Sequence, residues 1–174
     1  MTLCKQTGRG PRRLFGLVAI TLVAATAFAS ADPGDLAKKQ NRYKAIQNGA
    51  KSLLKAWNAL DTGKDDSTFK GHRVKAMKLI NEALAELDEA VNVADDSEVP
   101  ADKGKPFFDT KRGKLALEQT DYKAIHGGAK NLHDGGRSLD VGNNNFGGHR
   151  IKALKLIHSA LDELDEAVKA ANKN

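Results

Sequence analysis

The sequence predicts an all-α protein, a four-helix bundle made of two tandem antiparallel helical hairpins. Three observations predict this fold class. Residues 72–95 are identical to residues 149–172 at 16 of 24 aligned positions, which indicates an internal duplication. Apolar residues recur every three or four positions in both copies, the period of an amphipathic helix. Short polar segments rich in Asp, Asn and Gly interrupt these runs, as breaks between antiparallel helices do.

Residues 1–31 are expected to be a signal peptide that is not part of the fold. An uncharged run, residues 14–28, follows four basic residues: Lys5, Arg9, Arg12 and Arg13. The run is shorter than the ~20 residues that span a bilayer, and alanines after it have the spacing that a signal peptidase reads. We expect cleavage near Ala29–Ala31 and export to the periplasm or the cell exterior, with no membrane span in the mature protein. An uncleaved membrane anchor is the alternative.

Charge and cysteine content narrow the function classes. Four of the 28 basic residues and none of the 22 acidic residues lie in the first 31, so the remainder carries 24 basic and 22 acidic side chains, a formal charge of +2. This balance gives no support to nucleic-acid binding. The single cysteine, Cys4, lies in the predicted signal. The mature chain therefore has no disulfide, thiolate nucleophile or thiolate metal site.

The first hairpin is predicted over residues 32–95. Its first helix carries an apolar seam with 3-4 spacing that includes Tyr43, Ile46, Leu53, Trp57 and Leu60. Its second helix carries a seam of the same kind, made by Ala76, Ile80, Ala83, Leu87 and Ala90. A polar loop, residues 62–68, separates the two helices.

A linker over residues 96–114 connects this hairpin to the second one, residues 115–174. Pro100 and Pro106 stop helices there, and we expect Phe107 and Phe108 to pin the linker to one end of the bundle. The second hairpin repeats the seam from Leu115 through Tyr122 to Leu139. Two loosely tethered hairpins are one alternative, and pairing of hairpins between chains, which would make a homo-oligomer, is another.

The segment Gly-His-Arg occurs twice, as Gly71-His72-Arg73 and Gly148-His149-Arg150, just ahead of the second helix of each hairpin. The glycine permits a left-handed or closely approached backbone. Arg73 and Arg150 can reach the last carbonyl groups of the preceding helix, which lack helical partners. We therefore expect the segment to close the hairpin, with histidine and arginine as hydrogen-bond donors to those carbonyl groups.

The second interpretation makes His72 and His149 ligands of a weakly bound divalent metal, Zn, Cu or Ni. Metal sites usually combine three or four side chains at defined spacing, and neither H-x-x-x-H nor H-E-x-x-H occurs. A haem between the two histidines would need both at one end of the bundle. Three further histidines occur only in the second copy, where His126, His133 and His158 replace Gln47, Leu54 and Asn81. A two-histidine surface site is the functional alternative there, and no other cofactor is expected.

Glycines replace an aromatic residue in the second copy. The position of Trp57 is occupied by Gly136, beside Gly135. Two glycines within a helix cost about 1 kcal/mol each relative to alanine, so we expect a compensating contact. Our hypothesis is that the indole of Trp57 packs over the gap at Gly135 and Gly136, and the competing hypothesis is a small apolar ligand in that gap.

The Gly-Gly-His-Arg helix start, complete at Gly147-Gly148-His149-Arg150, resembles small exported bacterial helical-hairpin proteins. Lys70 interrupts the pattern in the first copy. The resemblance implies fold and export but no activity. The chain is also broadly similar in design to small periplasmic metal-binding helical bundles, which are dense in histidine, and five histidines are too few to transfer that function.

No catalytic motif stands out. The sequence has no G-x-S-x-G and no Gly-rich phosphate loop, and its carboxylate pairs sit on outward-leaning helix positions. We therefore expect a non-enzymatic envelope protein that binds a small ligand, a metal or another envelope protein, or that serves as a structural component.

Overall fold

The computed structural model describes residues 33–62, 66–93, 107–140 and 146–173, with side chains from residue 44 onward. These residues belong to the unit Asp32–Asn174. Within them every regular element is a helix and none is a strand, so the predicted all-α class is confirmed. The predicted signal peptide and its cleavage site lie outside the described residues, as does most of the predicted linker.

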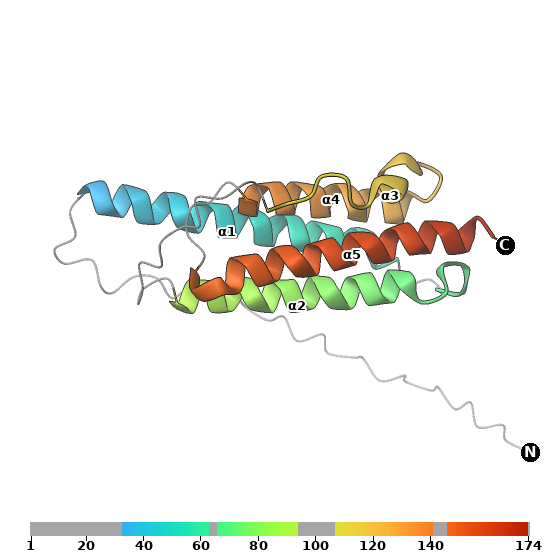
Figure 1. Ribbon diagram of the computed structural model, residues 1–174, viewed down its shortest axis with the longest axis horizontal. Coiled ribbons are helices and arrows are strands. Elements are labelled where there is room, and N and C mark those ends of the chain that lie inside the picture. Colours follow the sequence, from blue (N-terminus) through green and yellow to red (C-terminus); the bar gives the residue numbers. More distant parts are fainter. Residues whose placement is uncertain (1–32, 63–65, 94–106, 141–145, 174) are drawn as a thin grey trace, which may run out of the picture. The chain divides into compact units, whose positions relative to one another are not determined.

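The described part contains five α-helices and two short 3-10 helices (Figure 1). In chain order they are α1 Pro33–Leu60, η1 Ser67–Phe69, α2 His72–Val93, α3 Lys114–Glu118, α4 Lys123–Asp140, η2 Phe146–Gly148 and α5 His149–Ala171. Each copy of the sequence repeat thus ends in a 3-10 turn followed by a long helix. Among these helices, none combines the length and apolarity that crossing a membrane requires.

The seam of the second copy does not form one continuous helix, contrary to the prediction. The backbone leaves the helical region at Gln119, with φ −86° and ψ 85°, and α4 starts only at Lys123. Thr120 and Asp121 lie in the break, and side chains of this type compete with helical hydrogen bonds by bonding to nearby backbone. Leu115 and Tyr122 are seven residues apart, which is the spacing of a continuous heptad seam. The apolar pattern therefore does not reveal the break in the helix.

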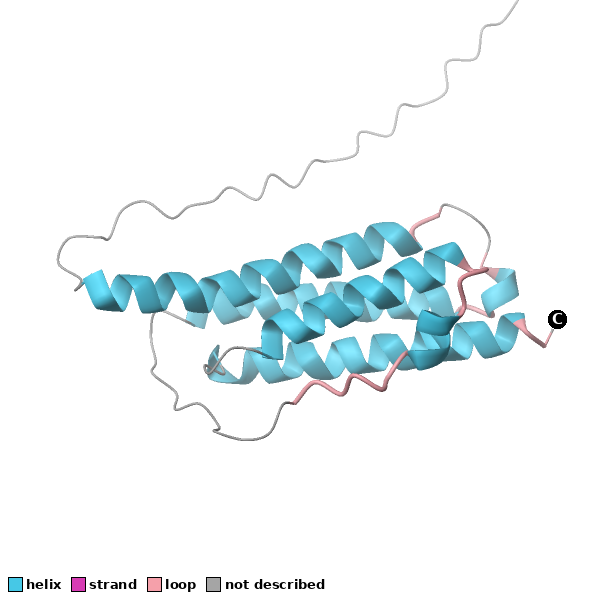
Figure 2. Cartoon of the chain, turned by 90° about the horizontal axis from the view of Figure 1, so that it is seen from above, coloured by secondary structure: helices cyan, strands magenta, loops and turns pink. Residues whose placement is uncertain are grey.

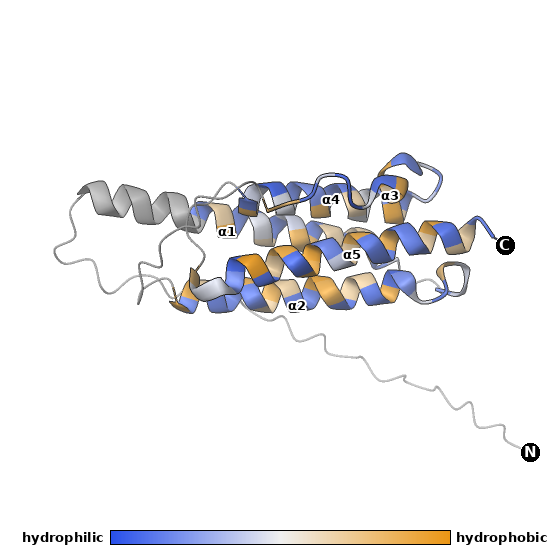
Figure 3. Ribbon diagram, in the orientation of Figure 1, coloured by the Kyte–Doolittle hydropathy of each residue, from blue (hydrophilic) through white to orange (hydrophobic). Residues whose placement is uncertain are grey.

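The helices pack mainly across the two copies. α1 packs most extensively on α4 and α2 on α5, whereas the contacts within each copy, α1 with α2 and α4 with α5, are smaller. Figures 1 and 2 show each of the larger pairs running antiparallel. Hydrophobic and hydrophilic residues alternate along the helices (Figure 3), and the buried hydrophobic residues of the four long helices form one cluster. Burial of this apolar cluster is the main favourable term that holds the helices together.

Two close approaches between α1 and α4 are reciprocal. A Cβ atom on Gly49 would lie 2.6 Å from Leu139 Cδ2, and a Cβ atom on Gly128 would lie 2.7 Å from Leu60 Cδ2. Gly49 aligns with Gly128 in the sequence repeat, and Leu60 aligns with Leu139. In each copy a leucine thus packs into the space, here termed the glycine notch, that the missing side chain of the other copy's glycine leaves.

The glycine of each Gly-His-Arg segment is required by its backbone conformation. Gly71 has φ +83° and Gly148 has φ +95°, a region that favours glycine. A Cβ atom at either position would meet nothing within 4 Å. Of the two roles expected for this glycine, the structure therefore shows the left-handed turn and not the close approach.

Candidate functional site

The arginine of each Gly-His-Arg segment caps the helix before it. Arg73 Nη1 donates to Leu60 O at 3.2 Å, and Arg150 Nη1 donates to Leu139 O at 2.9 Å. Arg73 also donates from Nε to Asp66 Oδ1 at 2.8 Å. Both guanidinium groups are buried. These bonds satisfy carbonyl groups that the ends of α1 and α4 would otherwise leave without partners.

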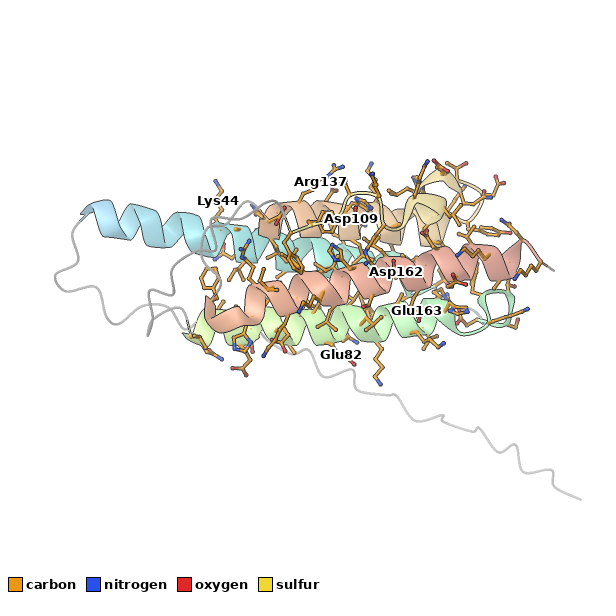
Figure 4. The ribbon with its side chains drawn as sticks, viewed as in Figure 1. Lys44, Glu82, Asp109, Arg137, Asp162 and Glu163 are labelled. Carbon is orange, nitrogen blue, oxygen red and sulfur yellow. The ribbon has the colours of Figure 1, made fainter. Side chains whose placement is uncertain are left out.

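The histidine of each segment bonds to a carboxylate and not to a carbonyl group, which corrects the expectation. His72 Nδ1 lies 2.6 Å from Glu163 Oε2, and His149 Nδ1 lies 2.7 Å from Glu86 Oε2. Since Glu86 aligns with Glu163 in the repeat, the two pairs are reciprocal and join α2 to α5. Glu163 is labelled in Figure 4. The histidines thus link the two copies of the repeat to each other.

The two histidines do not come together. His149 starts α5, and Glu163, the partner of His72, lies fourteen residues further along that helix, about 21 Å at 1.5 Å per residue. In the part of the chain that the structure describes, no group of three or more His, Cys, Asp or Glu side chains could hold a metal ion. Each repeated histidine therefore has one carboxylate partner in a separate place.

A segment that we term the strap, residues 107–118, lies along the second copy and includes α3. Its backbone N–H groups donate to side chains of α4 and α5: Phe107 N–H to Asp140 Oδ1 at 2.9 Å, Asp109 N–H to His158 Nε2 at 3.0 Å and Ala116 N–H to Asp165 Oδ1 at 3.0 Å. Arg112 forms an ion pair with Asp162; Asp109 and Asp162 are labelled in Figure 4. The strap is thus held on α4 and α5 by backbone hydrogen bonds and by an ion pair.

The three histidines that only the second copy has all hold the strap. His133 Nε2–H donates to Arg112 O at 2.7 Å, and His126 Nδ1–H donates to Leu117 O at 2.8 Å. The second of these bonds satisfies a carbonyl group near the end of α3. With His158 accepting from Asp109, these imidazoles account for three of the differences between the copies.

Phe108, and not Trp57, packs on Gly136 of α4. The ring of Phe108 occupies the space that a Cβ atom on Gly136 would need, and Gly135 faces Ser52 and Leu53 of α1 instead. Phe108 is buried and stacks on His158 with ring centroids 5.3 Å apart. The predicted contact between Trp57 and the glycines is therefore wrong, because the ring of Phe108, a residue of the predicted linker, occupies the space beside Gly136. Phe107 N–H bonds Asp140, the last residue of α4, and Phe108 packs further along the helices, on Gly136 and His158.

Burial lowers the pKa of His158, and the charge of Arg112 lowers it further, while Asp109, Asp162 and Asp140 oppose the shift. A lowered pKa favours the neutral imidazole, and only a neutral imidazole can accept the hydrogen bond from Asp109 N–H. The strap contact and the protonation state of His158 therefore depend on each other.

On the first copy, no described residue covers the surface that corresponds to the strap's binding surface. A cavity of about 320 Å³ lies between α1 and α2, and its lining includes Trp57, Asp61, Val74, Met77 and Asn81. We term it the first-copy groove. Among the described residues no acceptor bonds the buried Trp57 Nε1, and an unsatisfied buried donor costs roughly 1–3 kcal/mol. The groove was not predicted from the sequence. A signal was present, because three histidines and a glycine that occur only in the second copy all contact the strap, which covers the corresponding surface there.

Comparisons of the chain with protein-family models, with curated proteins and with solved structures gave no match.

Proposed function

We propose that the protein is a non-enzymatic, exported four-helix-bundle protein that acts by binding a ligand in the first-copy groove. The bundle would consist of two tandem antiparallel helical hairpins derived from one another by duplication. The sequence repeat supports the duplication, and the reciprocal contacts at the glycine notches and at the His–Glu pairs support a twofold arrangement of the copies.

The observation that carries the binding function is the open groove itself. An apolar side chain of its lining remains accessible, since Val74 is 54% exposed. Leu54, three residues before Trp57 on α1, is 44% exposed. Specific binding sites are concave and mainly apolar, with a few polar groups that fix orientation. Here Asp61 and Asn81, together with the cations Arg73 and Lys78, supply the polar and charged groups of the lining.

Trp57 is the only tryptophan of the chain, so its fluorescence reports on this groove alone. The apolar dye anilinonaphthalene sulfonate should bind the purified protein and receive excitation energy from Trp57. Val74→Glu should weaken dye binding about tenfold, because it places a charge on the apolar rim. Val91→Glu is the matched control, since Val91 is an exposed valine of α2 that does not line the groove. Equal dye binding by wild type and Val74→Glu would refute a ligand site here.

The alternative function, weak binding of a divalent metal by His72 and His149, has less support. Each of these histidines offers one imidazole and one carboxylate, where metal sites usually have three or four ligands. Calorimetric titration with zinc and with copper distinguishes the two functions. Binding that is lost in His72→Ala/His149→Ala would favour the metal; no binding, together with a lower melting temperature of that variant, would favour a structural role.

A further inference from the structure

We infer that the first-copy groove binds a peptide segment of another protein, one that carries an aromatic residue followed by a small residue. The inference rests on the proposed binding function and names its ligand. The strap shows how such a segment binds, because it occupies the corresponding surface of the second copy of the repeat.

Each side chain that accepts a hydrogen bond from a strap N–H group aligns with a residue of the first copy that can also accept one. Strap N–H groups donate to Asp140, His158 and Asp165. The residues of the first copy that align with these three are, in order, Asp61, Asn81 and Asp88. Each counterpart has a side-chain oxygen that accepts a hydrogen bond, and each is exposed. In the strap the first two of these bonds hold the irregular start, residues 107–109, and the third holds the first turn of α3. The first copy therefore keeps acceptors suited to a segment with an irregular start and a helical turn at its end.

The apolar surface beside these acceptors is also uncovered. His133 lies under the strap and is 4% exposed, whereas Leu54, which aligns with it, is 44% exposed. Ile151 is half-buried, whereas its counterpart Val74 is exposed. The same path over the helices is thus covered in one copy and open in the other.

One substitution between the copies sets the selectivity. In the second copy Gly136 leaves the notch that Phe108 fills. In the first copy Trp57 stands at that position and lines the groove, so a second aromatic ring of a bound segment would meet its indole. A cavity of about 320 Å³ has room for the first aromatic side chain of a segment, beside Trp57. The residue after it has to be small.

The same substitution argues against the strap of a second copy of this chain as the occupant. That strap carries Phe107 and Phe108 in succession, and Trp57 obstructs the second ring. The strap would also have to leave its own site, where its backbone makes five hydrogen bonds to side chains of α4 and α5 and Arg112 pairs with Asp162. A segment from a different protein meets neither obstacle.

Two synthetic peptides test the inference on the purified full chain. One has the sequence of residues 107–118, and the other has the same sequence with alanine in place of Phe108. The alanine peptide should bind saturably and change the fluorescence of Trp57, and the unmodified peptide should bind about tenfold more weakly because its second ring meets the indole. Equal affinities, or no fluorescence change with either peptide at millimolar concentration, would overturn the inference.

A matched pair of variants tests the location. Asp61→Ala removes an acceptor from the first-copy groove and should weaken binding of the alanine peptide about tenfold. Asp140→Ala removes the aligned acceptor under the strap and should leave that affinity unchanged, since Trp57 reports only on the first copy. Equal effects of the two variants would overturn the inference.

In Trp57→Gly the preference between the peptides should reverse, as measured by calorimetry. If that variant does not fold, the order of the two peptides on wild-type protein decides. A groove that binds the dye but neither peptide refutes this inference and leaves the proposed function standing, whereas a groove that binds neither dye nor peptide refutes both. A dimer in sedimentation that Asp61→Ala dissociates would make a second copy the occupant and would overturn the inference.

Discussion

The adjacent residues Gly127 and Gly128 of α4 should respond in opposite directions to the same change, glycine to alanine. A Cβ atom on Gly127 would lie 3.6 Å from Ala59 Cβ, an ordinary contact distance. The change there should stabilise the fold by up to about 1 kcal/mol, the advantage of alanine over glycine inside a helix. A Cβ atom on Gly128 would lie 2.7 Å from both Cδ2 and Cγ of Leu60, which is fully buried.

Leu60 would have to move by nearly 1 Å to reach contact distance, and overpacking of a dense core costs about 1–3 kcal/mol. The helix advantage offsets about 1 kcal/mol of this, so Gly128→Ala should lower the free energy of unfolding by up to about 2 kcal/mol. Urea unfolding of both variants, compared with wild type at a common m-value, measures the difference. Gly49→Ala provides the reciprocal check at Leu139 and should match Gly128→Ala. A Gly128→Ala protein as stable as Gly127→Ala would refute the proposed tight notch.

Three further predictions concern the strap and the turn before α2. Phe108→Ala should cost about 3 kcal/mol, the lower end for a buried aromatic ring, and should accelerate hydrogen exchange at the Asp109 amide; an unchanged exchange rate would contradict the packing described. Because burial lowers the pKa of His158 below its ordinary value of 6.5, the folded state takes up this proton less readily than the unfolded state. The contribution of His158 to stability is then complete above pH 6.5 and is lost as the pH falls through the folded value; His158→Asn should flatten this part of the urea-unfolding profile, and a variant with the wild-type profile would contradict the assignment. Lys70 has φ +48° where the second copy has Gly147, so Lys70→Gly should raise the melting temperature by relieving about 1 kcal/mol of backbone strain, and a lowered melting temperature would count against that strain.

The apolar period and the internal repeat were sufficient to predict the helical class and, apart from the break before α4, the approximate positions of the long helices. This was possible because apolar residues that recur every three or four positions all face the core. His72 and His149 were correctly placed at helix starts, and both guanidinium groups reach the carbonyl groups expected for them. The partners of the histidines could not be predicted. Glu86 and Glu163 lie in the acidic half of the second helix of each copy, and a pattern along one helix does not tell which residue of another helix faces it.

That Phe107 and Phe108 attach the linker to the bundle was predicted, but the surface to which the strap binds was not, for a different reason. Phe107 and Phe108 lack a periodic context, so nothing in their own segment says where they bind. The signal was present elsewhere, in the differences between the copies. His133, His158 and Gly136 each replace a different residue type, and taken separately they resemble neutral drift. Taken together they surround one surface, the surface that the strap covers.

The pairing of α1 with α4 and of α2 with α5 also bears on how quickly the chain folds. The two His–Glu bonds join residues 91 and 63 positions apart, and the main helix interfaces connect similarly distant parts of the chain. Helical proteins usually fold fast because most of their contacts are local. Here the chain has to close long loops, at an entropic cost, before its largest interfaces form. Its folding rate should therefore be closer to that of mixed α/β domains than to that of simple up-and-down helical proteins of equal stability.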